Sequence, residues 1–206
     1  PILTSREQWS ESAQLRNSPA VSVILTVINE SDHLEAAVNS VLQSDFAGEI
    51  EIVIAVGPSR DETRNVADKL ALRDRRITVV DNPSGRTPDG LNAALSHCHH
   101  EIIVRIDGHS EISNNYIDKA VKILQETGAV NVGGIMAAEG ITPFQRAVAR
   151  AMRSPIGVGP ARFHTGGSAG STDTVYLGVF KRSALDAIGG YDKRFTRAQE
   201  IGRAHV

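Results

Sequence analysis

Cysteine and excess charge of either sign are scarce in this sequence. Its 206 residues include one cysteine, Cys98, and the formal net charge is −2. A lone cysteine excludes an internal disulfide framework and is typical of a reducing compartment. Because neither sign of charge forms a long run, nothing indicates a nucleic-acid surface or a polybasic membrane patch. We therefore expect a cytoplasmic protein with no nucleic-acid partner.

Long hydrophobic runs and two common nucleotide-binding signatures are absent too. No stretch approaches the roughly 20 apolar residues that span a bilayer, and the chain begins without a signal-peptide pattern. There is no Gly-x-Gly-x-x-Gly after the first apolar run and no Gly-x-x-x-x-Gly-Lys-Ser/Thr anywhere. These absences argue against a dinucleotide-dependent dehydrogenase and a P-loop NTPase.

Short apolar runs alternate with amphipathic segments along the chain. The runs have the length of buried strands, and the segments carry apolar residues at helical spacing. This alternation predicts an α/β fold with a mostly parallel sheet and helices on both faces. We expect strands at 21–27, 49–56, 76–80, 102–106, 129–135 and 174–180, and helices at 5–15, 31–44, 61–72, around 91–95, and at 115–126 and 143–152. The stretch 181–192 predicts a further short helix that ends at Gly189-Gly190.

Each of the first four expected strands ends in a stretch rich in polar residues. Ligands of open α/β sheets bind beyond the carboxyl ends of the strands, so these residues are expected to share one site. Taken singly, Asn29 and Ser59 also suit helix caps, and Asp81-Asn82-Pro83 suits a turn. The residues are Thr26, Ile28, Asn29 and Glu30, then Ser59, Arg60 and Asp61, then Asp81, Asn82 and Arg86, then Asp107 and His109.

Asp107-Gly108-His109 carries the most chemistry among them. A carboxylate and an imidazole on either side of a glycine can coordinate one divalent cation, which would neutralise a diphosphate. The alternative is a plain turn. Arg86 has a similar pair of readings, as a bidentate phosphate ligand or as an exposed loop arginine. The histidines of 97–101 favour a helix C-terminus over a metal site, because no second cluster completes a ligand set.

Six segments follow one another in an order that resembles family 2 glycosyltransferases of the GT-A fold, particularly the succinoglycan-biosynthesis (ExoA-like) branch. The segments are VSVILTVINE, EIVIAVGPSRDET, DNPSGRTPDGLNAAL, EIIVRIDGHSEIS, TVYLGVFKRSALDAIGGYD and RAQE. The resemblance implies an inverting transferase that uses a nucleotide-diphosphate sugar and a divalent cation, Mn²⁺ or Mg²⁺. Its implied acceptor is a glycan or a lipid-linked molecule in cell-surface or exopolysaccharide synthesis.

The resemblance also implies roles for single residues. The first-strand motif would lie against base and ribose, Asp107 would face ribose or metal, and His109 would hold the metal. Glu200 would be the catalytic base. The expected nucleotide-sugar site comprises Thr26, Ile28, Asn29, Glu30, Ser59, Asp61, Arg86, Asn92 and Asp107; His164, in the Gly-rich 153–172 loop expected to act as a lid, and Asp173 are expected to face the acceptor.

Two positions depart from the family pattern. Val56 stands where many members have an Asp that accepts a hydrogen bond from uracil, so a uridine donor lacks that support. Glu200 stands where the branch usually has Asp. The stretch Glu200–Val206 is also what GAG ATC GGA AGA GCA CAC GTC encodes, which from its second base matches a common sequencing adaptor. We therefore expect 201–206 to be non-native and Glu200 to mark the place of a native acid.

The expected organisation follows from these observations. An N-terminal extension, 1–20, precedes one transferase domain, 21–200, with a nucleotide-binding half at about 21–110 and an acceptor-side half at about 111–200. Segments beyond it would allow membrane association. One alternative is a sugar-phosphate nucleotidyltransferase. That class requires a Gly- and Arg-rich loop with a Lys after the first strand, and Ile28-Asn29-Glu30 offers neither. The other is a truncated or degenerate domain that binds a nucleotide sugar without turnover.

Overall fold

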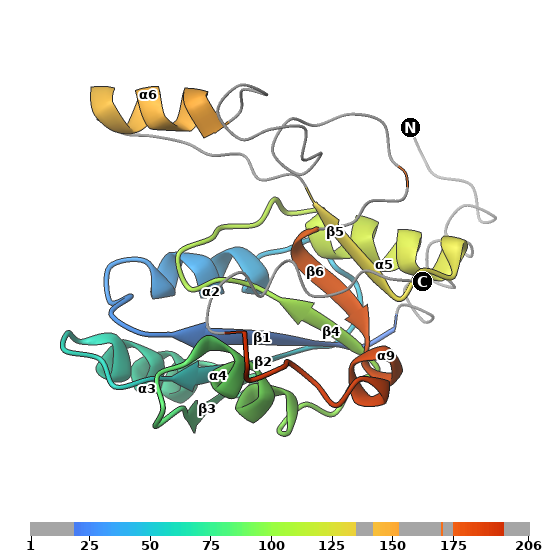
Figure 1. Ribbon diagram of the computed structural model, residues 1–206, viewed down its shortest axis with the longest axis horizontal. Helices are drawn as coiled ribbons and strands as arrows, with labels where there is room; N and C mark the ends of the chain where they lie inside the picture. The colour runs from blue at the N-terminus through green and yellow to red at the C-terminus, as the bar shows by residue number, and fades with distance from the viewer. Residues whose placement is uncertain (1–18, 135–141, 153–169, 171–174, 196–206) are drawn as a thin grey trace, which may run out of the picture.

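The computed structural model describes residues 19–134, 142–152, 170 and 175–195. Within them, six strands form one sheet in the order β3-β2-β1-β4-β6-β5 (Figure 1). The strands are β1 (Val21–Val27), β2 (Ile50–Val56), β3 (Ile77–Asp81), β4 (Ile102–Arg105), β5 (Asn131–Gly134) and β6 (Tyr176–Lys181). The helices are α2 (Leu34–Leu42), α3 (Thr63–Arg73), α4 (Thr87–Leu95), α5 (Tyr116–Thr127), α6 (Pro143–Met152) and α9 (Arg182–Ala187).

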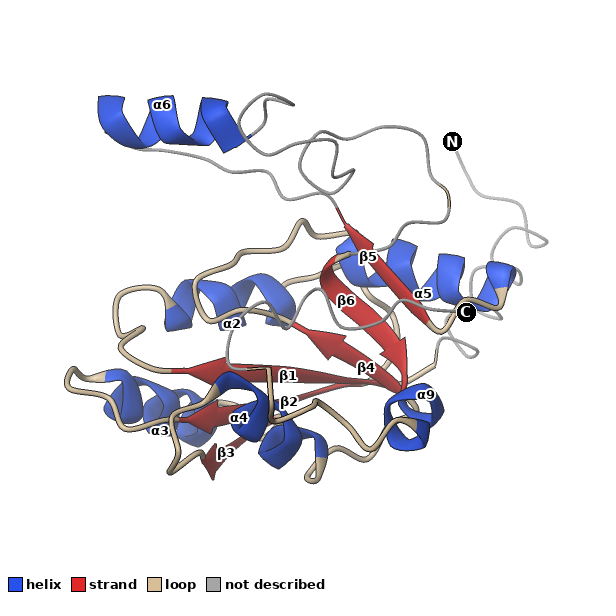
Figure 2. Ribbon diagram, in the orientation of Figure 1, coloured by secondary structure: helices blue, strands red, loops and turns tan. Residues whose placement is uncertain are grey.

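The sheet is mostly parallel, as predicted. Strands β3, β2, β1 and β4 run in the same direction, and only β6 runs against its neighbours β4 and β5. Helices α2, α3 and α5 pack on one face, and α4 and α9 on the other (Figure 2). Both faces are therefore covered, which explains why β1, β2 and β4 are almost continuous apolar runs.

The short helix expected to end at Gly189-Gly190 is confirmed. Helix α9 ends at Ala187, and the next two glycines, Gly189 and Gly190, have φ of 77° and 79°. Backbone with such positive φ leaves the right-handed helical region, and glycine adopts it without a Cβ clash. The expected helix at 5–15 lies outside the described residues. None of the helices that the structure describes has the length and apolarity to cross a bilayer.

A polar network joins the amino-terminal ends of β1 and β2 to the loop before β4. Ser22, which is fully buried, donates to the Glu51 carboxylate at 2.5 Å, and the His99 ring lies 2.9 Å from the same carboxylate. Nδ1 of His97 lies 2.9 Å from the Ala93 carbonyl in the last turn of α4. Two of the clustered histidines thus make structural contacts, and no three potential metal ligands gather among the described residues.

Glu51 makes the stability of this network depend on pH. Burial opposes its charge, but hydrogen bonds from Ser22 and His99 outweigh burial and lower the pKa of Glu51. A lowered pKa in the folded state means that ionised Glu51 stabilises the fold above the unfolded pKa of about 4.3. That contribution disappears as the pH falls through the folded pKa.

Glu51→Gln is therefore expected to lower the free energy of unfolding by about 1–2 kcal/mol near neutral pH. The difference from wild type should shrink at pH values below about 4, where the wild-type carboxylate is protonated in the unfolded chain. Urea denaturation at both pH values measures this, with the exposed neighbour variant Glu49→Gln as the control. A difference that does not change with pH would contradict the assignment.

Candidate functional site

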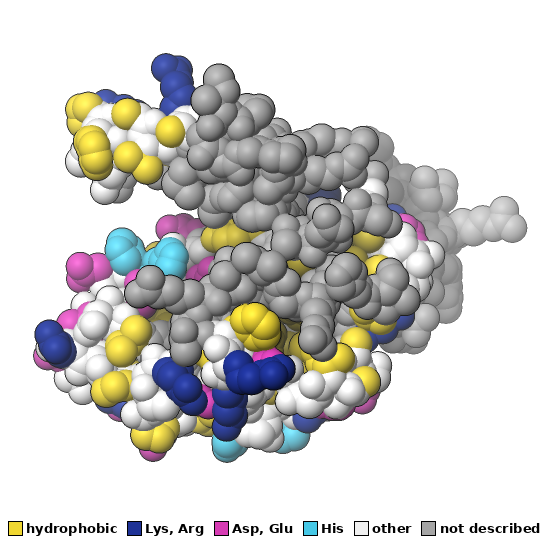
Figure 3. Space-filling view, in the orientation of Figure 1, with side chains coloured by type: hydrophobic (Ala, Val, Ile, Leu, Met, Phe, Trp, Pro, Cys, Tyr) yellow, Lys and Arg dark blue, Asp and Glu magenta, His cyan; other side chains and the backbone are white. Residues whose placement is uncertain are grey.

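The carboxyl ends of four parallel strands meet at one edge of the sheet. In the strand register, Val27 lies beside Val56, Val56 beside Asp81, and Ile24 beside Arg105. These strand ends and the loops that follow them hold the residues predicted from the first four strands. Figure 3 shows histidine and acidic side chains together at the end of the molecule where these loops lie.

The loops after β1 and β2 are tied to each other by Asn29 and Ser59. The Asn29 N–H donates to Ser59 Oγ at 3.1 Å, and the Arg60 N–H donates to Asn29 Oδ1 at 2.8 Å. Asn29 takes the left-handed conformation, φ 54°, that asparagine tolerates better than most residues. Neither side chain caps a helix: the N-cap residues of α2 and α3 are His33 and Glu62. The helix-cap alternative for Asn29 and Ser59 is therefore wrong.

Asp61 anchors the same pair of loops. Its carboxylate accepts hydrogen bonds from the Thr63 hydroxyl and N–H and from the Ser31 N–H, at 2.5, 3.1 and 3.0 Å. These bonds, that from the Thr63 hydroxyl foremost, hold the pKa of Asp61 well below its usual range. Thr63 in turn accepts from the Glu30 N–H at 2.7 Å. Asp61 thus fixes the backbone that carries Glu30.

Ile28 presents an apolar surface at this edge. Its side chain is 41% exposed, although it is large and hydrophobic. The loops that carry Gly57 and Gly85 pass close to each other and to Ile28. A Cβ on Gly57 would lie 3.3 Å from the Gly85 Cα and 3.5 Å from the Ile28 Cβ. An exposed aliphatic face between polar loops suits the flat ring of a nucleobase.

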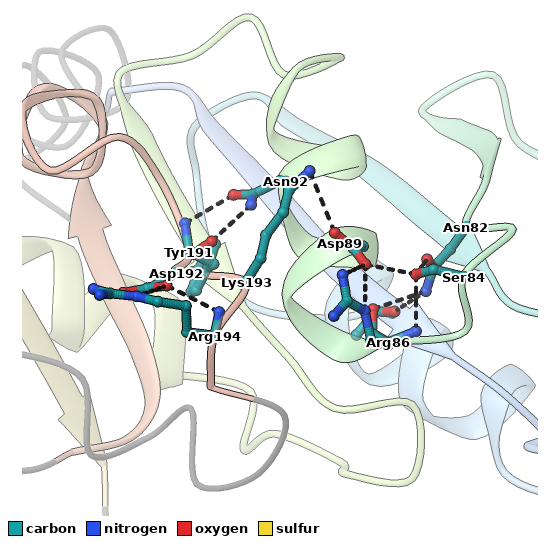
Figure 4. Close-up of polar contacts among 10 residues, drawn as sticks. Asn82, Ser84, Arg86, Asp89, Asn92, Tyr191, Asp192, Lys193 and Arg194 are labelled. Atoms are coloured by element: carbon teal, nitrogen blue, oxygen red, sulfur yellow. Dashed lines mark hydrogen bonds and ion pairs between the residues drawn. The ribbon is translucent and has the colours of Figure 1, made fainter.

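The loop before α4 is ordered around Asn82 and Asp89 (Figure 4). Asn82 is 2% exposed, and its side chain donates to the Arg86 carbonyl at 3.1 Å and to Thr26 Oγ1 at 3.4 Å. The Arg86 guanidinium donates to Asp89 at 2.8 Å and is about half exposed. Arg86 is thus a loop arginine with a carboxylate partner, held at the site edge where a bound phosphate would compete with Asp89.

Asp107 and His109 each have a charged neighbour that was not predicted from the sequence. Arg105, only 6% exposed, donates to Asp107 Oδ1 at 3.2 Å. His109 Nδ1 lies 2.9 Å from Glu30 Oε1, across the gap between the β1 and β4 loops. A charged residue inside the apolar run Ile102–Ile106 is unusual, because arginine is rarely buried without a partner. This position alone could therefore have predicted that Arg105 pairs with an acidic group.

The structure leaves other predicted residues away from this cluster or undescribed. Asn92 faces the turn after α9, with both polar atoms of its amide bonded to the backbone of Tyr191. Glu200, His164 and Asp173 lie outside the described residues. The edge of the sheet therefore brings together Thr26, Ile28, Asn29, Glu30, Ser59, Asp61, Arg86, Asp107 and His109.

Known proteins resemble this chain in sequence and in fold. The sequence model described as "Glycosyl transferase family 2" matches residues 22–189. The succinoglycan biosynthesis protein ExoA of Rhizobium meliloti (strain 1021) is 29% identical over 180 residues, which cover 86% of this chain and 54% of ExoA. The chain thus spans about half the length of that relative.

Solved structures extend the resemblance to the fold. S. aureus TarS 1-349 superposes with a TM-score of 0.67 at 16% identity, over 88% of this chain and 53% of that one. The mannosyltransferase PcManGT from Pyrobaculum calidifontis, in complex with GDP-Man and Mn²⁺, gives 0.63 at 20% identity, over 90% and 54%. The sheet has the GT-A arrangement, and the chain belongs to glycosyl transferase family 2.

Proposed function

We propose that this chain is the donor-binding domain of an inverting glycosyltransferase that moves a sugar from a nucleotide-diphosphate donor to a glycan or lipid-linked acceptor in polysaccharide synthesis. One observation carries the proposal: His109, two positions after Asp107, lies with its Nδ1 2.9 Å from Glu30 Oε1 at the carboxyl ends of β1 and β4. In an α/β sheet this is where a ligand binds, and these groups suit a divalent cation with the phosphates it accompanies.

The residues present fit Mn²⁺ or Mg²⁺. A metal-ligating histidine usually gives one ring nitrogen to a carboxylate and the other to the metal. The His109–Glu30 contact uses Nδ1, so Nε2 would be left to ligate the cation, and Asp107 would supply an oxygen. Such cations commonly take one or two protein groups and complete their shell with substrate phosphates and water. A third protein ligand is therefore not required.

The side chains of this chain would have separate roles in sugar transfer. Ile28 offers the base an apolar surface, while Asn29 and Ser59 fix the loops around it. Asp107 and His109 would hold the cation, which when bound neutralises the diphosphate and assists its departure as a Lewis acid. Glu200 is the proposed general base, taking the proton of the acceptor hydroxyl as that oxygen attacks the anomeric carbon from the opposite side.

The identity of the nucleobase in the sugar donor follows less directly from these residues. Val56 is 2% exposed at the end of β2, where it offers no acceptor to a uracil N–H. Among the structural relatives, TarS is described in complex with UDP-GlcNAc and PcManGT in complex with GDP-Man. The donor experiment therefore has to include both a uridine and a guanosine nucleotide.

Calorimetric titration of UDP and GDP, each with and without Mn²⁺, tests the proposal. One diphosphate is expected to bind only when the metal is present, and His109→Ala is expected to abolish that metal-dependent binding. The control is His33→Ala, which removes an exposed histidine at the start of α2. Binding that needs no metal and is unchanged in His109→Ala would overturn the proposal. Metal-dependent binding without release of diphosphate from a sugar donor would identify a binding domain instead.

A further inference from the structure

Asn92 joins helix α4 to the turn that follows α9, 99 positions along the chain. Its Nδ2 donates to the Tyr191 carbonyl at 2.8 Å, and its Oδ1 accepts from the Tyr191 N–H at 2.8 Å. Figure 4 shows the amide facing the Tyr191 peptide in this reciprocal arrangement. The amide therefore pairs with a backbone segment in the way that a neighbouring strand would.

The turn is shaped to receive this amide. A Cβ added to Gly190 would lie 2.5 Å from Asn92 Oδ1, and Gly190 also has a φ of 79°. The ring of Tyr191 packs edge-on against Phe180 with centroids 6.3 Å apart. Lys193 lies 3.4 Å from Asp89, which is on α4 as well. The segment 189–193 is thus docked onto α4 at several points.

Helix α4 is itself fixed to the edge that carries the candidate donor site. Gly90 lies so close to β1 that a Cβ there would come 2.1 Å from Thr26 Oγ1. The adjoining loop is held by the buried Asn82. Contacts therefore run without a break from the end of β1, through α4 and Asn92, to the turn at Tyr191.

We propose that Asn92 is a positioning residue for sugar transfer. It holds the 189–193 turn against α4, and so fixes, relative to the donor site, the point from which the chain continues toward Glu200. This inference rests on the proposed function, in which Glu200 is the general base. It gives Asn92 a task different from the direct nucleotide contact that the resemblance implies, because both polar atoms of the amide are engaged with Tyr191.

The test compares binding with turnover in Asn92→Ala. Affinity for the diphosphate with Mn²⁺ should stay within about threefold of wild type, because both polar atoms of the Asn92 amide are bonded to Tyr191. Release of diphosphate from the matching sugar donor should slow by roughly 10- to 100-fold, since small misplacements of reacting groups have costs of that size. Asn65→Ala, an exposed asparagine on α3, is the matched control and should change neither.

A double-mutant cycle separates positioning from general damage. Gly190→Ala disturbs the same contact by placing a Cβ close to Asn92 Oδ1, so on its own it should also slow turnover. In Asn92→Ala the clashing Oδ1 is gone, and the two effects should be clearly less than additive. Hydrogen exchange of the peptide that contains Tyr191 needs no ligand and should accelerate in both variants.

Two results would overturn the inference. One is a loss of diphosphate affinity in Asn92→Ala that matches the loss in His109→Ala, which would make Asn92 a nucleotide ligand. The other is unchanged turnover or unchanged exchange at Tyr191. A wild-type chain that binds no diphosphate with Mn²⁺ would instead refute the proposed function, and the exchange result would still report whether Asn92 holds the turn.

Discussion

Gly90→Ala is expected to lower the free energy of unfolding by about 2–3 kcal/mol, a cost typical of forcing an extra carbon into a packed site. Helix propensity alone predicts the opposite, because alanine is favoured over glycine inside a helix by about 1 kcal/mol. We expect the destabilisation from the steric clash to exceed the gain in helix propensity. The new Cβ would lie 2.1 Å from Thr26 Oγ1 and 2.7 Å from Asn82 Nδ2, and Asn82 is buried.

The consequence for function should be larger than the loss of stability suggests. To accept the Cβ, α4 has to move away from β1, and Asp89 and Asn92 move with it. We expect turnover to fall at least tenfold while the chain remains folded, because misplacement of positioned groups is costly. Thermal denaturation and donor turnover measure the two effects.

A rescue variant shows whether the clash is the cause. Thr26→Ala removes the hydroxyl oxygen at 2.1 Å and leaves the Asn82 contact, so it should restore part of the stability of Gly90→Ala. Thr26→Ala by itself removes a 3.4 Å hydrogen bond from Asn82 and one methyl group of a half-buried side chain, and should cost little. Equal stability of Gly90→Ala and wild type would show that α4 packs less tightly on β1 than the structure indicates.

The sheet could be predicted because its signals are local. Buried parallel strands leave continuous apolar runs, and the order of strand and helix along the chain indicates a parallel sheet. The direction of β6 could not be predicted. Residues Tyr176–Lys181 are an apolar run like the others, and their reversal depends on pairing with Ile102–Val104 rather than on any residue within the strand.

The candidate site could be predicted in its residues but not in its contacts. The rule that strand ends gather at one edge selected Glu30, Asp61 and His109 correctly as neighbours of that edge. Their hydrogen bonds are tertiary: Glu30 and His109 are 79 positions apart, and no pattern in the sequence joins them. The same is true of Asn92, whose partner Tyr191 lies 99 positions away on the turn after the glycines that end α9.

Glu30→Ala is expected to weaken Mn²⁺-dependent binding of the diphosphate by about 10- to 100-fold, the usual cost of losing the partner that orients a metal-ligating histidine. Glu30 is well placed for that role. Its N–H is held by Thr63, its carbonyl accepts from the Leu34 N–H at 2.9 Å, and its carboxylate is 21% exposed beside a His109 ring that is 60% exposed. Glu30, which is held in place, thus orients the more exposed ring of His109.

Charge alone is a competing explanation, because any acid nearby attracts a cation. Asp32→Ala removes the same charge two positions away, where the Asp32 carboxylate lies 3.5 Å from the Ser31 hydroxyl. Calorimetry should give a small effect for Asp32→Ala, a large one for Glu30→Ala and an intermediate one for Glu30→Gln, which keeps an acceptor for Nδ1–H. Equal losses in Glu30→Ala and Asp32→Ala would mean that Glu30 acts only through its charge. An unchanged affinity in Glu30→Ala would mean that His109 needs no partner to bind the metal.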